Sequence, residues 1–136
     1  MAIASDPAEP KWMRWTGIVL SAVVILFMLM DVTMKLLQLP IAVEAGEQLG
    51  WPAASVVPLG IVLLICTALY AFPRTSVFGA ILLTAYLGGA VATHARIGSP
   101  ILSHTLFGVY LGVLLWGGLY LRDARLRVFI PLRTPA

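Results

Sequence analysis

Four long apolar segments constrain the fold of this 136-residue chain more than any other feature of its sequence. They cover about residues 15–38, 53–72, 75–95 and 100–121, and each is close to the roughly 20 helical residues that cross a bilayer. The chain is 60% hydrophobic and 11% charged, whereas a soluble domain carries roughly 25% charged residues. A core of this size could not bury so much apolar surface. The sequence therefore predicts an all-α polytopic membrane protein with a four-transmembrane-helix bundle.

Proline and glycine breaks separate these segments, at Pro40, "GWP" (50–52), "FPRTS" (72–76) and "GSP" (98–100). We expect an N-terminal segment over residues 1–14, a transmembrane domain over 15–121 and a basic tail over 122–136. The loop 39–52 favours an interfacial or re-entrant segment over a solvated loop, because of its apolar residues Ile41, Val43, Ala45 and Leu49. Before the fourth segment, Ser99 and Pro100 form a suitable N-cap and first-turn pair.

The basic residues at the ends of the segments predict the orientation of the chain in the membrane. One side carries Lys11, Arg14, Arg74, Arg122, Arg125, Arg127 and Arg133, and the other carries only Lys35 and Arg96. Because basic loops stay in the cytoplasm, both termini are predicted to be cytoplasmic. The net charge of +3 is small and scattered, so it does not suggest binding to nucleic acid. The bilayer is the partner that the composition implies.

With that orientation, the carboxylates of three residues fall on the outer side. Asp31 and Lys35 share one face of the first helix. About 24 Å of uncharged helix precedes Asp31, so this carboxylate is expected just inside the hydrocarbon, where charges pair or line wet cavities. A simple ion pair between Asp31 and Lys35, without a binding role, explains these two residues equally well. Glu44 and Glu47 form an i,i+3 pair if the loop is helical, and the alternative is that both face water.

The third and fourth segments each carry a row of small and polar residues on one helix face, and both rows reach the outer side of the membrane. Tyr86, Gly89, Thr93 and Arg96 share one face of the third helix, and His104, Gly108 and Gly112 share one face of the fourth. Joined by a short loop, these helices are antiparallel neighbours, so His94, Arg96 and His104 are expected at one depth. Gly108-x-x-x-Gly112 and the group Gly88, Gly89 and Ala92 predict close helix packing or a homo-oligomer contact.

The residue types on this side favour a binding pocket over catalysis. No HxxxH or ExxH spacing supports a metal site, and haem is disfavoured because both histidines lie at helix ends. Neither Ser99, Ser103 nor Thr105 has a spacing that selects it as a nucleophile. A wet pocket for a small polar or amphipathic molecule, such as a quinone head group, needs only the donors and acceptors present. Candidate ligand-binding residues are Asp31, Lys35, Glu44, Glu47, Tyr86, Thr93, His94, Arg96 and His104.

The runs "MDVTMKLLQLP" (30–40), "LYAFPRT" (69–75) and "LLTAYLGGAVATH" (82–94) resemble the DoxX-like family of small bacterial membrane proteins. The resemblance covers about residues 26–133. It implies four transmembrane helices in the bacterial inner membrane, and outer polar positions at Asp31, Lys35, Glu44, Thr93, His94 and Arg96. The wider DoxX superfamily is associated with respiratory and thiol-related oxidoreductase complexes, including thiosulfate:quinone oxidoreduction. Cys66 is the single cysteine, so the chain lacks a dithiol centre of its own.

Three functions follow as hypotheses. The first is a protein without catalysis of its own, which binds a small molecule in the outer polar pocket or serves as an accessory subunit of a membrane redox assembly. The second is the membrane subunit of a quinone-linked oxidoreductase that works with a partner subunit. The third is a small-solute transporter, which the position of the charges near one face favours least.

Overall fold

The structure is a computed structural model, which describes residues 9–130, and within that range it is helical without strands. Short turns connect the helices, and the expected tail residue Arg133 lies outside the described residues. In chain order the elements are α1 (Lys11–Leu36), α2 (Pro40–Gln48), the 3₁₀ turn η1 (Ala53–Ser55), α3 (Val56–Ala71), α4 (Ser76–Arg96), the π-helical turn η2 (Ile101–Thr105), α5 (Phe107–Arg122) and α6 (Ala124–Phe129).

Four helical stretches are long and apolar enough to cross a membrane, namely Lys11–Leu36, Ala53–Ala71, Ser76–Arg96 and Ile101–Arg122. The predicted all-α fold with four membrane-spanning helices is thus confirmed. Large apolar side chains such as Leu26, Ile65 and Val113 are more than half exposed. Lipid is the solvent that accommodates such side chains.

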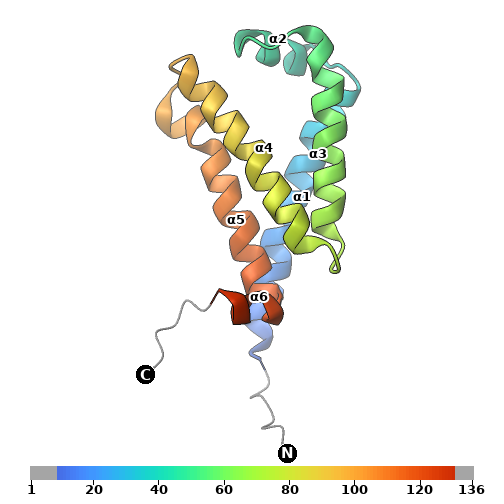
Figure 1. The fold of residues 1–136 in the computed structure, drawn as a ribbon, viewed down its shortest axis with the longest axis vertical. Helices are drawn as coiled ribbons and strands as arrows, with labels where there is room; N and C mark the ends of the chain where they lie inside the picture. The colour runs from blue at the N-terminus through green and yellow to red at the C-terminus, as the bar shows by residue number, and fades with distance from the viewer. Residues whose placement is uncertain (1–8, 131–136) are drawn as a thin grey trace, which may run out of the picture.

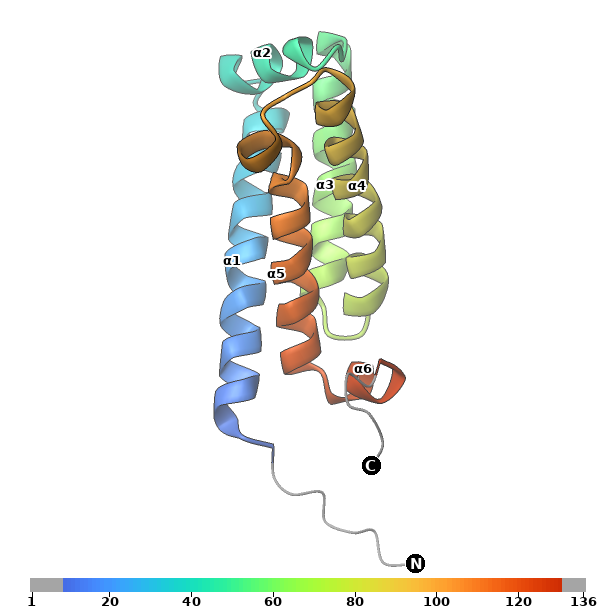
Figure 2. The same ribbon diagram turned by 90° about the vertical axis from the view of Figure 1, so that its left-hand side faces the viewer.

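The four long helices form a closed ring (Figures 1 and 2). Helix α1 packs against α3 and α5, and α4 completes the ring by packing against the same two helices. The contact between α1 and α5 is the most extensive. The short helix α2 lies across one end of the bundle and α6 across the other (Figure 1). We refer to these as the α2 end and the α6 end; the first turn of α1 lies at the α6 end.

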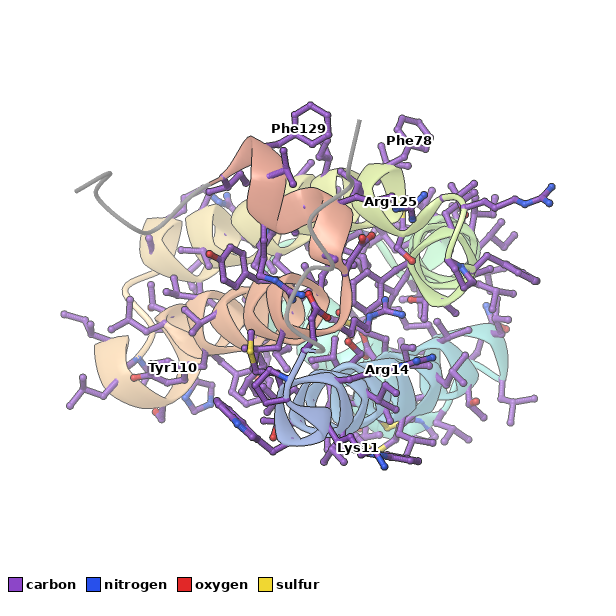
Figure 3. The ribbon with its side chains drawn as sticks, turned by 90° about the horizontal axis from the view of Figure 1, so that it is seen from below. Lys11, Arg14, Phe78, Tyr110, Arg125 and Phe129 are labelled. Carbon is purple, nitrogen blue, oxygen red and sulfur yellow. The ribbon has the colours of Figure 1, made fainter. Side chains whose placement is uncertain are left out.

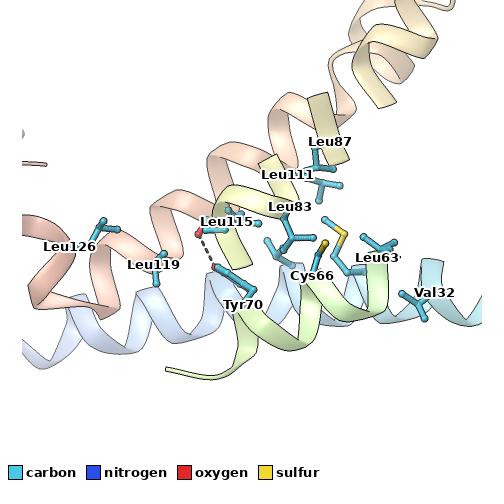
Figure 4. Packing of buried hydrophobic residues seen from close by; sticks show 13 residues of the cluster. Val32, Leu63, Cys66, Tyr70, Leu83, Leu87, Leu111, Leu115, Leu119 and Leu126 are labelled. Atoms are coloured by element: carbon cyan, nitrogen blue, oxygen red, sulfur yellow. Dashed lines mark hydrogen bonds between the residues drawn. The ribbon is translucent and has the colours of Figure 1, made fainter. Parts of the chain in front are cut away.

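Buried side chains from all four long helices form the core (Figure 4). Tyr70, in the last turn of α3, is fully buried in it. The Tyr70 hydroxyl lies 2.7 Å from the carbonyl oxygen of Leu115, to which it donates, and 3.0 Å from the Ser21 Oγ. One hydroxyl therefore connects α3 with both α1 and α5. Hydrogen bonds of this kind help to hold helices together in lipid, where apolar burial supplies little driving force.

Three glycines bring helix backbones into direct contact near the α6 end. A Cβ atom on Gly17 would lie 2.6 Å from the Arg122 nitrogen, and one on Gly118 would lie 2.6 Å from the Ser21 Oγ. A Cβ atom on Gly79 would overlap the backbone of Tyr70. Any larger residue at these positions would force α1 away from α5, or α4 away from α3.

The predicted close packing of the α4 and α5 glycines is largely wrong. A Cβ atom on Gly88, Gly89 or Gly112 would meet nothing within 4 Å. Only Gly108 is tightly packed among these four, since a Cβ atom there would lie 2.8 Å from the Val91 Cγ2. The reason is the rotation of the helices about their axes. Gly88 and Gly112 line a surface groove on one side of the α4–α5 contact, whereas Gly89 lines a cavity on the other side.

Candidate functional site

A cavity of about 520 Å³ lies at the α2 end, between the long helices and beneath α2. Most of its lining is apolar, with Phe27, Leu59 and Phe107 among the large side chains. Six of the predicted site residues also line it: Asp31, Lys35, Tyr86, Thr93, His94 and His104. The structure therefore brings together side chains from α1, α4 and η2 that are separated by up to 73 positions in the sequence (104 − 31).

Asp31 and Lys35 form an ion pair on the cavity-facing side of α1. They are one helical turn apart, and both side chains are partly buried. Met28 and Val32 of the same helix are buried in the core, so the helix cannot rotate the pair away without exposing them. Because the two charges cancel, placing the pair near hydrocarbon costs less free energy than placing either charge there alone.

The two histidines meet at the turn between α4 and α5. Their ring centroids are 5.9 Å apart in a T-shaped arrangement. The His94 Nδ1 lies 3.0 Å from the Ser99 Oγ, and the His104 Nδ1 lies 2.7 Å from the Ser103 Oγ. Since each Nδ1 is occupied by a serine, each ring keeps its Nε2 for a further donor or acceptor.

The turn that carries His104 differs from the predicted helix start. Pro100 rather than Ser99 is the N-cap, and Ile101–Thr105 form a π-helical turn. The Thr105 nitrogen donates to the Pro100 oxygen over 3.1 Å, and the Leu106 nitrogen donates to the Ile101 oxygen over 2.9 Å. The expected Ser99 cap is therefore wrong, because the Ser99 hydroxyl bonds to His94 instead. Single π turns of this kind occur often at functional sites.

Two polar side chains of α4 complete the polar lining, and they differ in hydrogen bonding. The Thr93 hydroxyl donates to the Gly89 carbonyl oxygen one turn earlier, over 2.7 Å. Within residues 9–130, the Tyr86 hydroxyl has no hydrogen-bond partner, although Tyr86 is partly buried and lines the cavity. Tyr86 is therefore the phenol that can donate to, or accept from, a molecule in the cavity.

Helix α2 roofs the cavity with one face. Ile41, Ala45 and Leu49 recur every four residues and all line it. Glu44 and Glu47 lie outside the cavity and are exposed, which agrees with the alternative that both face water. The roof is joined to the bundle through two residues with positive φ, Gln38 (φ 51) and Gly50 (φ 84).

Arg96 holds this roof instead of lining the cavity. Its Nη2 donates to the Leu49 carbonyl oxygen over 2.5 Å, which ties the last turn of α4 to the end of α2. A Cβ atom on Gly50 would lie 2.8 Å from the same Nη2, so a glycine leaves room for the guanidinium. Arg96 thus shapes the site from outside.

Sequence reasoning missed the residues that complete the site. Ser99 and Ser103 fix the histidine rings. Phe27 packs on Phe107 with ring centroids 5.2 Å apart. The period of four in Ile41, Ala45 and Leu49 is a signal that could have identified the roof, whereas no local pattern marks Phe27 as a lining residue.

The arrangement offers hydrogen-bond donors and acceptors in an apolar cavity. The two serine hydroxyls that bond to the histidines, those of Ser99 and Ser103, are not among the residues that line it. In the part of the chain from residue 9 to 130, no group of three or more histidine, cysteine or carboxylate side chains is placed to hold a metal ion. The site is thus suited to binding a small molecule by shape and hydrogen bonds.

Comparison with curated proteins and with solved structures gives no significant match. The sequence model of the DoxX-like family matches residues 19–118. The match includes all but the first turns of α1, the whole of α2, α3 and α4, and most of α5. It therefore contains every residue named above as lining the cavity. This membrane protein belongs to the DoxX-like family.

Proposed function

We propose that the cavity at the α2 end binds a small, uncharged amphipathic molecule of the quinone type, and that the chain performs no catalysis by itself. The observation that carries this proposal is the combination of an apolar cavity of about 520 Å³ with six polar side chains gathered in its lining. Small-molecule sites commonly have volumes of about 300–1,000 Å³ and a few convergent polar groups.

The polar groups favour an uncharged head group. Asp31 and Lys35 neutralise each other, so a charged ligand would have to break their ion pair. A ring carbonyl needs only a donor, which the Tyr86 hydroxyl and an Nε2–H of His94 or His104 can supply. The apolar part of such a molecule would lie against Phe27, Leu59 and Phe107.

The proposed location of the cavity is the extracytoplasmic side of a bacterial inner membrane, with both termini cytoplasmic. The support is the asymmetry of charge. Of the described residues, the α6 end carries Lys11, Arg14, Arg74, Arg122, Arg125 and Arg127 against Glu9 and Asp123, whereas the α2 end carries Lys35 and Arg96 against Asp31, Glu44 and Glu47.

The single cysteine makes this orientation testable. In a Cys66→Ala background, Glu47→Cys and Arg74→Cys each introduce one exposed thiol, at opposite ends of the bundle. A membrane-impermeant maleimide added to whole spheroplasts should label the cysteine at 47 and leave the one at 74 unlabelled. The reverse pattern would place the cavity on the cytoplasmic side.

A role as accessory subunit of a membrane redox assembly fits such a cavity, with an oxidoreductase as the partner subunit. The groove beside Gly88 and Gly112 offers a surface for a second copy of the chain.

The alternative function is a membrane subunit of a quinone-linked oxidoreductase, which would use the cavity at the α2 end with a redox-active occupant. It predicts that the partner reduces bound quinone, whereas an accessory subunit binds quinone without changing its rate of reduction.

Quinone binding can be measured directly, because Trp51 lines the cavity and quinones quench tryptophan fluorescence. A short-tailed ubiquinone should quench the purified protein in nanodiscs with saturation. Gly89→Leu should weaken this binding by at least about tenfold (about 1.4 kcal/mol), because its side chain would project into the cavity, where a Cβ atom meets nothing within 4 Å.

The matched control is Gly117→Leu, which adds the same side chain at another open position, outside the cavity. It should bind as the wild type does. Tyr86→Phe should weaken binding by about threefold to tenfold, through the loss of one hydrogen bond. Equal binding by wild type and Gly89→Leu would overturn the proposal.

A further inference from the structure

Two arginines from distant parts of the sequence converge at the α6 end. Arg74 lies in the turn between α3 and α4, and the Arg125 Nη2 donates to the carbonyl oxygen of Pro73, the preceding residue, over 3.4 Å. Arg74 is exposed. Among residues 9–130 it has neither a hydrogen-bond partner nor a carboxylate partner, so its positive charge is available to an external anion.

Helix α6 is held in place by contacts on several sides. The Asp123 carboxylate caps it by accepting from the Arg125 nitrogen over 2.9 Å. Leu126 is buried in the core cluster. The Arg127 Nη1 donates to the carbonyl oxygens of Tyr120 and Leu121 over 2.7 and 3.0 Å. These contacts fix the position of Arg125 relative to the turn that carries Arg74.

Large apolar side chains are exposed at the same end of the molecule. Phe129 is 83% exposed and Phe72 is 66% exposed. Phe78, on the first turns of α4, is also more than half exposed. Seen from the α6 end, Phe129 and Phe78 project toward the same side of the molecule (Figure 3). Aromatic and basic residues at the end of membrane-spanning helices are typical of the boundary between head groups and acyl chains.

The charges on this end are only partly compensated. Glu9 is paired with Arg127, and Asp123 is paired with Arg125. Both acidic residues described at this end are thus engaged, and Arg74 carries an excess charge beside the aromatic side chains. A partner for this surface must therefore combine an anionic group with apolar chains.

We propose that the α3–α4 turn and α6 form a binding site for an anionic phospholipid. Its phosphate lies between Arg74 and Arg125, and its acyl chains lie against Phe72, Phe78 and Phe129. An anionic leaflet attracts juxtamembrane basic residues in this way. A soluble acidic protein would leave the aromatic side chains without a partner, so the lipid is the occupant that satisfies both features.

Native mass spectrometry of the full chain, released from nanodiscs that hold equal amounts of phosphatidylglycerol and phosphatidylcholine, tests the proposal. The wild type should retain phosphatidylglycerol in preference to phosphatidylcholine, and the ratio of the two retained lipids is the retention ratio. Arg74→Gln should reduce the retention ratio by about fivefold, and Arg74→Gln/Arg125→Gln should reduce it further. The single variant removes no contact within residues 9–130, so the fold does not depend on it.

The matched control is Lys11→Gln/Arg14→Gln, which removes the same net charge from α1 at the same end. It should change the ratio by less than about twofold. Equal losses in both double variants would overturn the proposal, because overall charge would then account for the selectivity. Unchanged retention in Arg74→Gln/Arg125→Gln would also overturn it, as would displacement of the lipid by inorganic phosphate alone.

Discussion

The two ends of the bundle are built in opposite ways. Near the α6 end, glycines bring backbones into contact, and one buried tyrosine hydroxyl links three helices. Near the α2 end, the same helices enclose a cavity with an ion pair and two histidines in its lining. The comparison indicates that one half of the molecule is tightly packed and that the other half accommodates the volume and polarity on which the proposed binding depends.

This division has a physical basis in the solvent. In lipid, helix association depends on close packing and hydrogen bonds more than on apolar burial. A cavity of about 520 Å³ forfeits packing contacts, so tight contacts elsewhere must compensate for it. Helix backbones approach most closely at Gly17, Gly79 and Gly118.

The largest expected effect is at Gly79. In Gly79→Val, the side chain would overlap the Tyr70 backbone, so the unfolding free energy should fall by about 3 kcal/mol or more. Thermal unfolding in detergent measures this effect. Gly112→Ala, at a position with open space around its Cβ, should unfold like the wild type. Similar losses in both variants would contradict the division of the bundle into a tightly packed half and a half that holds the cavity.

The next largest effect concerns the ion pair at the α2 end. Asp31→Asn leaves Lys35 without its counter-ion and should cost about 2 kcal/mol of stability, whereas Asp31→Asn/Lys35→Met should cost less than the single change. A double-mutant cycle of unfolding free energies measures the coupling. Additive losses would mean that the two residues act independently and that the cavity wall does not depend on their pairing.

A smaller effect is expected at the core hydroxyl. Tyr70→Phe removes the hydrogen bonds to Ser21 and Leu115 and should lower the unfolding free energy by about 1 kcal/mol. The matched variant is Tyr110→Phe, which removes a single bond from an exposed tyrosine to the Leu102 carbonyl oxygen. It should cost clearly less. The reverse order would show that the polar link is not what stabilises the α6 end.

The smallest effect is pH-dependent and lies in α6. Burial opposes ionisation of Asp123, but hydrogen bonds from Arg125 outweigh it and lower the pKa of this carboxyl below its ordinary value. Its stabilisation of α6, about 0.5 kcal/mol, is therefore complete above about pH 4 and is lost as the pH falls through the lowered pKa. The amide chemical shift of Arg125 should report this transition, and Asp123→Asn should abolish it.

The fold was predictable because apolar length is a local property, which a sequence displays directly. Part of the site was predictable for a related reason. A short loop forces two helices to be antiparallel neighbours, and this brings His94 near His104 without any knowledge of their packing. The position of α2 was only partly predictable. The sequence shows its apolar residues, but it does not show how the helix is oriented over the cavity.

The packing of glycines could not be predicted in the same way. Gly17 and Gly118 are 101 positions apart (118 − 17), and their contact depends on the rotation of two helices about their axes. The sequence displays a GxxxG pattern at 108–112, yet only Gly108 is used for close contact. The role of Arg96 was missed for the same reason, because its partner is a backbone carbonyl of another element.

The extensive contact between α1 and α5 has a consequence for biosynthesis. The first membrane span leaves the ribosome long before the last, and at about 5–20 residues per second the interval lasts several seconds. During this time α1 can pair with α3, but its Gly17 surface has no partner helix until α5 is inserted. The bundle therefore closes only after the final span is released, and a chain that ended between α4 and α5 would leave α1, α3 and α4 without the helix that completes the ring.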